Sequence, residues 1–246
     1  MALIHSFESA GNILFKYRGQ IPVVLFILTI PVIYFTPDID NNTLSLIITI
    51  ISVILSVLGF VVRAYAVATT SRGTSGRNTK NQVAETLNTD GIYSVIRHPL
   101  YLGNYLMWIG ITVFTYNIYF FVIISLFFWL YYERIMFAEE RFLEKKFGKD
   151  FLDWSLKVPA FIPCFKKYIK SSVSFSCKSV LRREYSGVLA TVFGFTFVDI
   201  LRYYFVFHKF EWNRISLYIL AVTIIITIIL RTIKHNTKWL CDKNHS

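Results

Sequence analysis

The chain has few cysteines, and their number and spacing exclude two kinds of structural site. Its 246 residues include only Cys164, Cys177 and Cys241. An odd number of cysteines without metal-ligand spacing indicates neither a disulfide framework nor a zinc site, and we expect no bound metal. A cleavable signal peptide is not expected either, because no small-residue cleavage site follows the apolar run near the N-terminus.

Acidic residues are also scarce, and the resulting imbalance of charge needs an explanation. The chain has 26 lysines and arginines against 15 aspartates and glutamates, a net charge of +11. Of the 26 basic residues, 22 fall in four segments, residues 1–20, 69–100, 133–184 and 231–246. Basic residues gather in this way in the cytoplasmic segments of membrane proteins. The charge therefore indicates membrane orientation, and it requires no nucleic acid as a partner.

Hydrophobic sequence, in contrast, is abundant. Hydrophobic residues make up 54% of the chain, charged residues only 17%, and the mean hydropathy is +0.50, which is typical of membrane proteins. Residues 44–62 carry neither charge nor proline and are long enough to span a bilayer, and residues 215–230 form a similar run. Weaker candidates cover residues 21–36, 101–114, 118–132 and 185–207.

These runs predict an all-α, polytopic integral membrane protein with about six transmembrane helices. Residues 101–132 are too long for one tilted helix, and Tyr116-Asn117 supplies a polar break, so we expect two helices joined by a short turn. Residues 133–165 are predicted to continue the second helix into water until Gly148 ends it. The chain then divides into an interfacial segment 1–20, a membrane core 21–165, a basic connector 166–184, and a C-terminal hairpin and tail 185–246.

Two local expectations follow from side-chain placement. The first 20 residues can form an interfacial helix with Phe7, Ile13, Leu14 and Phe15 turned into lipid, a loose tail being the alternative. Asp199 and Arg202 lie three positions apart within a predicted span. Charges this close on one helix are expected to pair.

The most informative motif runs from Gly91 to Gly103, where an Arg-His-Pro turn stands at the start of a hydrophobic stretch. The carboxylate pair Glu139-Glu140 lies at the far end of the next stretch. A hairpin of two helices returns to the same membrane face, so the cationic turn and the carboxylates are expected to meet where the hairpin reaches water. Phe-Gly at 147–148 and the segment Val-Pro-Ala-Phe-Ile-Pro at 158–163 follow.

In their order and spacing these motifs resemble the isoprenylcysteine carboxyl methyltransferase family and its phospholipid-methyltransferase relatives, over roughly residues 58–165. The resemblance implies methyl transfer from S-adenosylmethionine (SAM), bound in a cytoplasmic region of the protein. It also implies that cofactor contacts come from residues of both motifs. These are Tyr93, Arg97, His98, Tyr101, Gly103, Glu139 and Glu140, with His98, Tyr101 and Gly103 at the cofactor and Glu140 favoured over Glu139.

The residue types suit such a cofactor. Carboxylates bind ammonium and ribose hydroxyl groups, aromatic faces bind a sulfonium, and the free amides at a helix start favour a carboxylate. Each residue also has an ordinary interpretation. His98 can be a surface residue at the end of a span, Tyr101 an interfacial anchor, and Glu139-Glu140 a solvated pair bonded to Arg141 or Lys145.

The loop from Arg72 to Lys80 has the glycines, hydroxyls and cations of an anion-binding site, although it is not a Walker motif. Arg77 in this loop and Arg134 beside the carboxylates are the candidates for contact with the methyl acceptor. An ordinary positive-inside connector is the alternative for the loop. The stretch 63–101 also resembles a bacterial subgroup that methylates the 1-phosphate of lipid A. Two tyrosines common in the family are replaced by Phe151 and Trp154, which weakens any transfer of acceptor identity.

The acceptor is expected to be an oxyanion of a membrane lipid, because an anionic oxygen needs no general base, whereas an amine must first lose a proton. A lipid phosphate is favoured, and a prenylcysteine carboxylate or a phospholipid amine is the alternative. A reductase would need more spans, and a non-catalytic scaffold would not need the two motifs on one membrane face. The expected location is the bacterial inner membrane with the site facing the cytoplasm. The oligomeric state is left open.

Overall fold

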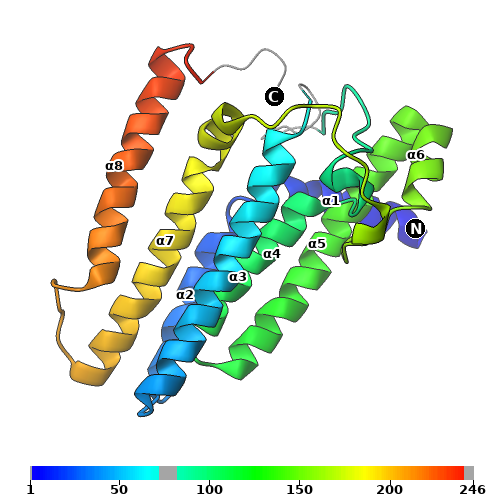
Figure 1. The fold of residues 1–246 in the computed structure, drawn as a ribbon. Coiled ribbons are helices and arrows are strands. Elements are labelled where there is room, and N and C mark those ends of the chain that lie inside the picture. Colours follow the sequence, from blue (N-terminus) through cyan, green and yellow to red (C-terminus); the bar gives the residue numbers. More distant parts are fainter. Residues whose placement is uncertain (1, 72–81, 241–246) are drawn as a thin grey trace.

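The computed structural model describes residues 2–71 and 82–240, and this part of the chain is built from helices. Figure 1 shows most of the long helices running side by side, with α1 lying across one end next to α5. The α-helices are α1 (Leu3–Tyr17), α2 (Ile21–Phe35), α3 (Asn42–Ala68), α4 (Pro99–Val113), α5 (Ile118–Phe147), α6 (Lys149–Ser155), α7 (Cys177–Phe207) and α8 (Ile215–Asn236). Within the described ranges, β-structure is limited to isolated bridges, one of which joins Gly91 to Ile169.

Four of these helices, α3, α5, α7 and α8, are long and apolar enough to cross a membrane. Residues 23–35 of α2 form a shorter apolar helix. The 15 residues of α4 rise about 22 Å at 1.5 Å per residue, which is less than a bilayer core of about 30 Å. The prediction of a polytopic all-α membrane protein is confirmed, and each of the six predicted runs forms a helix.

The break within residues 101–132 lies where the sequence predicts it. Helix α4 ends at Val113 and α5 begins at Ile118. Tyr116 has a positive φ of 63°, and the Asn117 side chain accepts a hydrogen bond from the Phe120 amide at 2.9 Å. An asparagine in this position caps the N-terminus of the new helix. The two helices therefore form a hairpin with a very short turn.

Small residues allow α3 and α4 to pack closely. A Cβ atom added to Gly59 would lie 2.5 Å from the Gly103 carbonyl oxygen, and one added to Gly110 would lie 2.1 Å from Ser56 Oγ. Ser56 Oγ also donates a hydrogen bond to the Met107 carbonyl at 3.0 Å. Small and hydroxyl residues at a helix contact are typical of membrane bundles. The contact holds the start of α4 in place beside α3.

The segment after α6 returns to the Arg-His-Pro turn and holds it by backbone hydrogen bonds. Helix α5 ends at Gly148, whose φ of 54° favours glycine, as the sequence predicts. After α6, the Pro159 carbonyl accepts from the Arg97 amide at 2.9 Å, and the Ala160 carbonyl accepts from the His98 amide at 3.2 Å. The proline-bearing segment thus fixes the backbone that precedes α4.

Helix α1 differs from the interfacial helix that the sequence suggests. Phe15 is buried in the core cluster around α5, and Leu14 packs against that cluster. Phe7 packs edge-on against Phe137, with ring centres 5.9 Å apart, whereas Ile13 is exposed. The expectation that all four side chains face lipid is wrong for Phe15, because α1 packs along α5.

One expectation for the C-terminal third is corrected, and the start of α7 is now defined. Helix α7 begins at Cys177, with the Ser176 side chain as its cap, so residues 177–184 of the predicted connector 166–184 are helical. Asp199 pairs with Arg214 at the start of α8, while Arg202 pairs with Asp38. The two α7 charges have partners on other segments, which compete with a pair along the helix.

Candidate functional site

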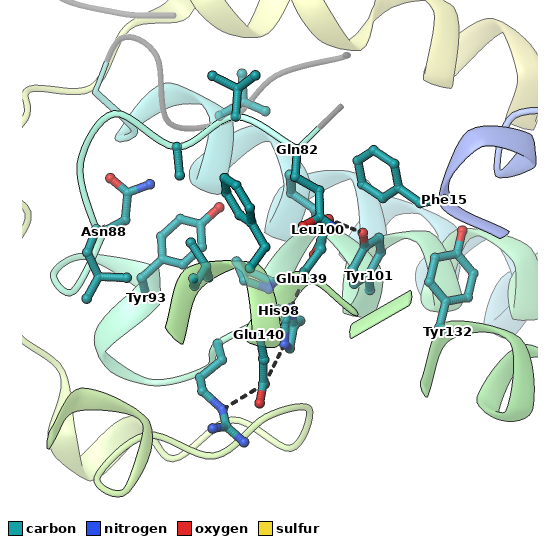
Figure 2. A pocket seen from close by; sticks show the side chains of 18 of the residues that line it. Phe15, Gln82, Asn88, Tyr93, His98, Leu100, Tyr101, Tyr132, Glu139 and Glu140 are labelled. Atoms are coloured by element: carbon teal, nitrogen blue, oxygen red, sulfur yellow. Dashed lines mark hydrogen bonds and ion pairs between the residues drawn. The ribbon is translucent and has the colours of Figure 1, made fainter. Parts of the chain in front are cut away.

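A cavity of about 330 Å³ lies between the start of α4, the C-terminal half of α5 and neighbouring parts of α1, α3, α6 and α7. This size falls within the range of small-molecule sites. Its walls come from both motifs singled out in the sequence and from residues 82–88. Figure 2 shows the labelled side chains, with Glu139 and Glu140 beside His98 and Tyr101.

His98 and Glu140 form the centre of the polar cluster. His98 Nε2 lies 2.8 Å from Glu140 Oε1, and because an ionised carboxylate only accepts, the ring nitrogen is the donor. Arg97 Nε lies 3.3 Å from the same oxygen. The His98 side chain is buried, while about a quarter of the Glu140 side chain is exposed toward the cavity. One carboxylate therefore receives two cationic or hydrogen-bonding groups and still borders the open space.

Local sequence explains why this turn holds its shape. Pro99 is the first residue of α4, where a missing amide proton costs nothing, and His98 is the cap with an extended φ of −121°. The backbone bonds to Pro159 and Ala160 hold the two residues before the proline. The imidazole is thereby directed at Glu140, in the last third of α5.

Glu139 has a second set of partners. Tyr101 Oη donates a hydrogen bond of 2.6 Å to Glu139 Oε1, and His98 Nδ1 lies 3.8 Å from Glu139 Oε2. The Tyr101 ring packs on Tyr132, with ring centres 4.8 Å apart. The two adjacent carboxylates are thus held apart by different donors, although they follow each other on one helix.

Aromatic groups complete the wall near the η1 turn (Ile92–Ser94). Burial raises the pKa of the Tyr93 phenol to about 12, and the Glu139 carboxylate adds to the shift. The phenol therefore stays protonated at physiological pH and can donate. Trp154, one of the two departures from the family pattern, donates its indole N–H to the Tyr93 carbonyl at 3.2 Å. The indole thus links α6 to the η1 turn.

The structure places six of the nine predicted site residues at the cavity and two elsewhere, and the ninth lies outside the described residues. Those at the cavity are Tyr93, Arg97, His98, Tyr101, Glu139 and Glu140. Gly103 lies at the contact of α3 and α4, where its missing side chain makes room for Arg63. Arg134 lies on the α1 side of α5, with its guanidinium carbon 3.6 Å from the centre of the Phe7 ring. Arg77 lies outside the described residues.

Gly103 and Arg134 thus lie at contacts between helices, whereas the resemblance implies that Gly103 is at the cofactor and the sequence makes Arg134 a candidate contact for the methyl acceptor. Gly103 serves the close approach of two helices, and Arg134 is not among the residues that line the cavity. The carbonyl of Arg134 would lie only 2.1 Å from a Cβ atom at Gly11, which shows how closely α1 approaches α5 here. The physical reason is the same in both cases, because the faces of α4 and α5 that carry these residues are covered by another helix.

Other residues at the cavity were not singled out as site residues from the sequence. They are Arg18, Arg63, Asn104, Tyr132, Arg183 and Glu184. Arg63 carried a signal, since a charge in the middle of an apolar span is costly and usually functional. Little in the sequence indicated that Glu184 belongs to the site, because it lies in a basic stretch that continues into α7. Its position depends on how α7 packs against α3.

Comparison with known proteins shows that part of the chain is similar to one family of enzymes. Residues 47–150 match the family model described as phospholipid methyltransferase. A protein-S-isoprenylcysteine O-methyltransferase of Schizosaccharomyces pombe is 30% identical over 44% of this chain and 48% of its own length. One of Xenopus laevis is 31% identical over 53% of this chain and 44% of its own length. A cobalt-zinc-cadmium resistance protein of Cupriavidus metallidurans is 36% identical over 34% of this chain and 38% of its own length.

The chain covers less than half of the length of each of these three relatives. No solved structure matches the chain. The family segment contains α3 from residue 47, the turn before α4, and the hairpin of α4 and α5, which together carry His98, Glu139 and Glu140. Helices α7 and α8 follow the family segment.

Proposed function

We propose that the chain, whose residues 47–150 belong to the phospholipid methyltransferase family, is a membrane enzyme that methylates an anionic oxygen of a membrane lipid. Methyltransferases of this family use SAM as the methyl donor. The favoured acceptor is a lipid phosphate such as the 1-phosphate of lipid A. The enzyme works at the cytoplasmic face of a bacterial inner membrane, with residues 21–165 as its core.

The observation that carries this proposal is the meeting of His98, Tyr101, Glu139 and Glu140 at one cavity. Two carboxylates border a space that aromatic side chains also line, and the hydrogen bonds of 2.8 and 2.6 Å fix their orientation. Such a set fits the ammonium and hydroxyl groups of SAM, and aromatic faces fit its sulfonium. Glu140, Glu139, His98, Tyr101, Tyr93 and Arg97 would hold the cofactor.

The chemistry asks mainly for binding and alignment. SAM supplies an activated methyl group, so the residues of the chain must orient the two reactants and exclude water. A phosphate or carboxylate oxygen is already anionic at neutral pH and attacks without a general base. The cavity carries the guanidinium groups of Arg18, Arg63, Arg97 and Arg183, which favour an anionic acceptor.

One observation keeps a second acceptor in consideration. Two of the relatives described above are named protein-S-isoprenylcysteine O-methyltransferases, and by this name they transfer the methyl group to an oxygen atom. A carboxylate at the end of a prenyl chain is an oxyanion, like a lipid phosphate, and it would suit the same arginines. A phospholipid amine suits them less well, because it is cationic until it loses a proton.

Replacement of Glu140 by Gln tests the cofactor part of the proposal. Loss of a charged hydrogen-bond acceptor should weaken the binding of S-adenosylhomocysteine by about 10- to 100-fold, corresponding to about 1.5–3 kcal/mol. Glu144→Gln is the matched control, since Glu144 lies one turn further along α5 and pairs with Arg141. Affinity is measured on the purified protein in detergent by calorimetry.

Lipid mass spectrometry tests the reaction. Membranes of cells that express the wild-type protein should contain one lipid class heavier by one methylene group, and cells that express Glu140→Gln should contain much less of it. Wild-type affinity for S-adenosylhomocysteine in Glu140→Gln would remove Glu140 from the site. An unchanged set of lipids with intact cofactor binding would refute the lipid acceptor and favour a protein carboxylate.

A further inference from the structure

A partly buried arginine joins the family segment to the C-terminal hairpin. Arg63 comes from α3 and Glu184 from α7, 121 positions later. Arg63 Nε donates to Glu184 Oε2 at 2.7 Å, and Arg63 Nη2 donates to Glu184 Oε1 at 2.8 Å. Arg63 Nη1 donates to Asn104 Oδ1 of α4 at 2.5 Å. The Glu184 side chain is 3% exposed, whereas the Arg63 side chain is 18% exposed.

The geometry leaves part of the guanidinium unused. An arginine has five N–H donors, and among the described residues three of these donors on Arg63 are engaged. The two that remain are on the terminal nitrogens. Both Arg63 and Glu184 line the cavity, and Arg183, next to Glu184 on α7, lines it too. The side of the cavity formed by α3, α4 and α7 therefore carries more positive than negative charge.

Close packing fixes the position of Arg63. The Cγ atom of Arg63 lies 2.4 Å from where a Cβ atom at Gly103 would be, so the stem of the arginine passes directly over this glycine. Asn104, the next residue of α4, also approaches Tyr132 Oη, at 3.5 Å. Tyr132 packs on Tyr101, which bonds Glu139. The arginine thus lines the same cavity as the carboxylates, and a series of side-chain contacts connects it to Glu139.

We propose that Arg63 binds the anionic head of the methyl acceptor and that Glu184 is the positioning residue that holds Arg63 in place. The proposal rests on the proposed function and adds the acceptor side of the site to it. It also makes the hairpin of α7 and α8 part of the catalytic unit, although it follows the segment that the family model covers. A bidentate partner orients a guanidinium, and the free terminal donors then suit a phosphate or carboxylate oxygen.

An ion pair that only joined two helices would not need to lie at the cavity. The pair between Arg214 and Asp199, near the other end of α7, also uses two guanidinium nitrogens, and Ser216 donates to the same carboxylate. That pair does not border the cavity. Arg214 and Asp199 therefore provide a matched control, with the same type of bond on the same helix and no access to the proposed acceptor.

The test measures phosphate binding separately from methyl transfer. The probe is lysophosphatidic acid, a single-chain lipid with a phosphomonoester head, and the monoacylglycerol with the same chain is the reference without phosphate. The purified full-length chain in detergent is titrated with each. Wild-type protein should bind lysophosphatidic acid more tightly. Arg63→Met and Glu184→Gln should weaken this binding by about tenfold or more, while affinity for S-adenosylhomocysteine changes little. Arg214→Met should keep both affinities.

A charge exchange separates positioning from stability. The double variant Arg63→Glu with Glu184→Arg restores an ion pair between α3 and α7, so its melting temperature should exceed that of Arg63→Met. Phosphate binding should stay low, because the guanidinium then starts from the other helix. If the exchange restores phosphate binding together with stability, or if Arg63→Met binds lysophosphatidic acid as the wild type does, the proposal is wrong.

Two further outcomes keep the inference distinct from the proposed function. If Arg63→Met does not fold, Arg63→Lys is used, since a lysine keeps the charge but cannot bind Glu184 through two nitrogens. Its affinity for lysophosphatidic acid should fall between those of the wild type and Glu184→Gln, and wild-type affinity would overturn the proposal. Phosphate binding without any methylated lipid would refute the proposed function alone. Methylation by wild type and Arg63 variants alike would refute the inference alone.

Discussion

Replacement of Gly103 by Ala decides between two roles for this glycine. The resemblance implies that Gly103 lets the cofactor come close, whereas the structure places it against α3. A Cβ atom at position 103 would lie 2.4 Å from Arg63 Cγ and 2.8 Å from the Gly59 carbonyl oxygen. A real Cβ atom essentially never lies this close to atoms of another residue, so either the arginine stem or one of the helices must move.

The expected size of the effect follows from two opposing terms. In an unobstructed helix, Gly→Ala stabilises by about 0.5–1 kcal/mol, because alanine has less conformational freedom to lose. Overpacking a tight contact costs about 1–3 kcal/mol. We therefore expect Gly103→Ala to lower the free energy of unfolding by up to about 2 kcal/mol. Gly59→Ala should cost at least as much, because its new methyl group would meet the backbone of α4 at 2.5 and 2.8 Å.

Gly187→Ala on α7 is the control for this experiment. Its added Cβ atom would meet Glu184 Oε2 at 3.6 Å and Met107 Cε at 3.9 Å, which are ordinary contacts. The gain in helix propensity should then appear alone, and the protein should be unchanged or slightly more stable. Thermal unfolding in detergent gives the melting temperature of each variant, and titration with S-adenosylhomocysteine gives its cofactor affinity.

The two roles predict opposite patterns. With a packing role, Gly103→Ala lowers the melting temperature by several degrees, and S-adenosylhomocysteine binds the remaining folded protein with near wild-type affinity. With a cofactor role, the melting temperature stays the same and cofactor binding is lost. The second pattern would contradict the packing argument, and it would return Gly103 to the cavity wall as the resemblance implies.

Two further predictions concern the side of the membrane and the loop outside the described residues. Membrane-impermeant thiol reagents should react from the cytoplasmic side with Cys164, which is partly exposed, and with Cys177, which is exposed. The same is expected of Cys241 from its position in the sequence. Periplasmic labelling of Cys164 would separate the site from a cytosolic cofactor. Arg77→Ala should raise the KM for the lipid acceptor while affinity for SAM stays nearly the same, and Arg77→Lys should recover part of the loss; loss of SAM binding in Arg77→Ala would assign this loop to the cofactor.

The local pattern of the sequence predicted most of the secondary structure. Uncharged runs became helices, Asn117 began α5, and Gly148 ended it, because hydropathy, side-chain caps and positive φ values act within a few residues. The sequence also predicted that the turn at His98 and the carboxylate at Glu140 meet. A very short turn forces the two helices of the hairpin to run antiparallel, so the start of α4 and the late part of α5 lie at the same end. The 2.8 Å contact between His98 and Glu140 follows from this arrangement.

Packing between distant segments decided the rest. That Glu139 bonds Tyr101 while Glu140 bonds His98 depends on the rotation of α5 about its axis, which the sequence does not specify. That Phe15 is buried depends on α1 packing along α5. Arg63 read alone is an unpaired charge in an apolar run. Its partner lies 121 positions away in a stretch with no local periodicity to mark it, and only the contact of α7 with α3 brings that carboxylate within 2.7 Å.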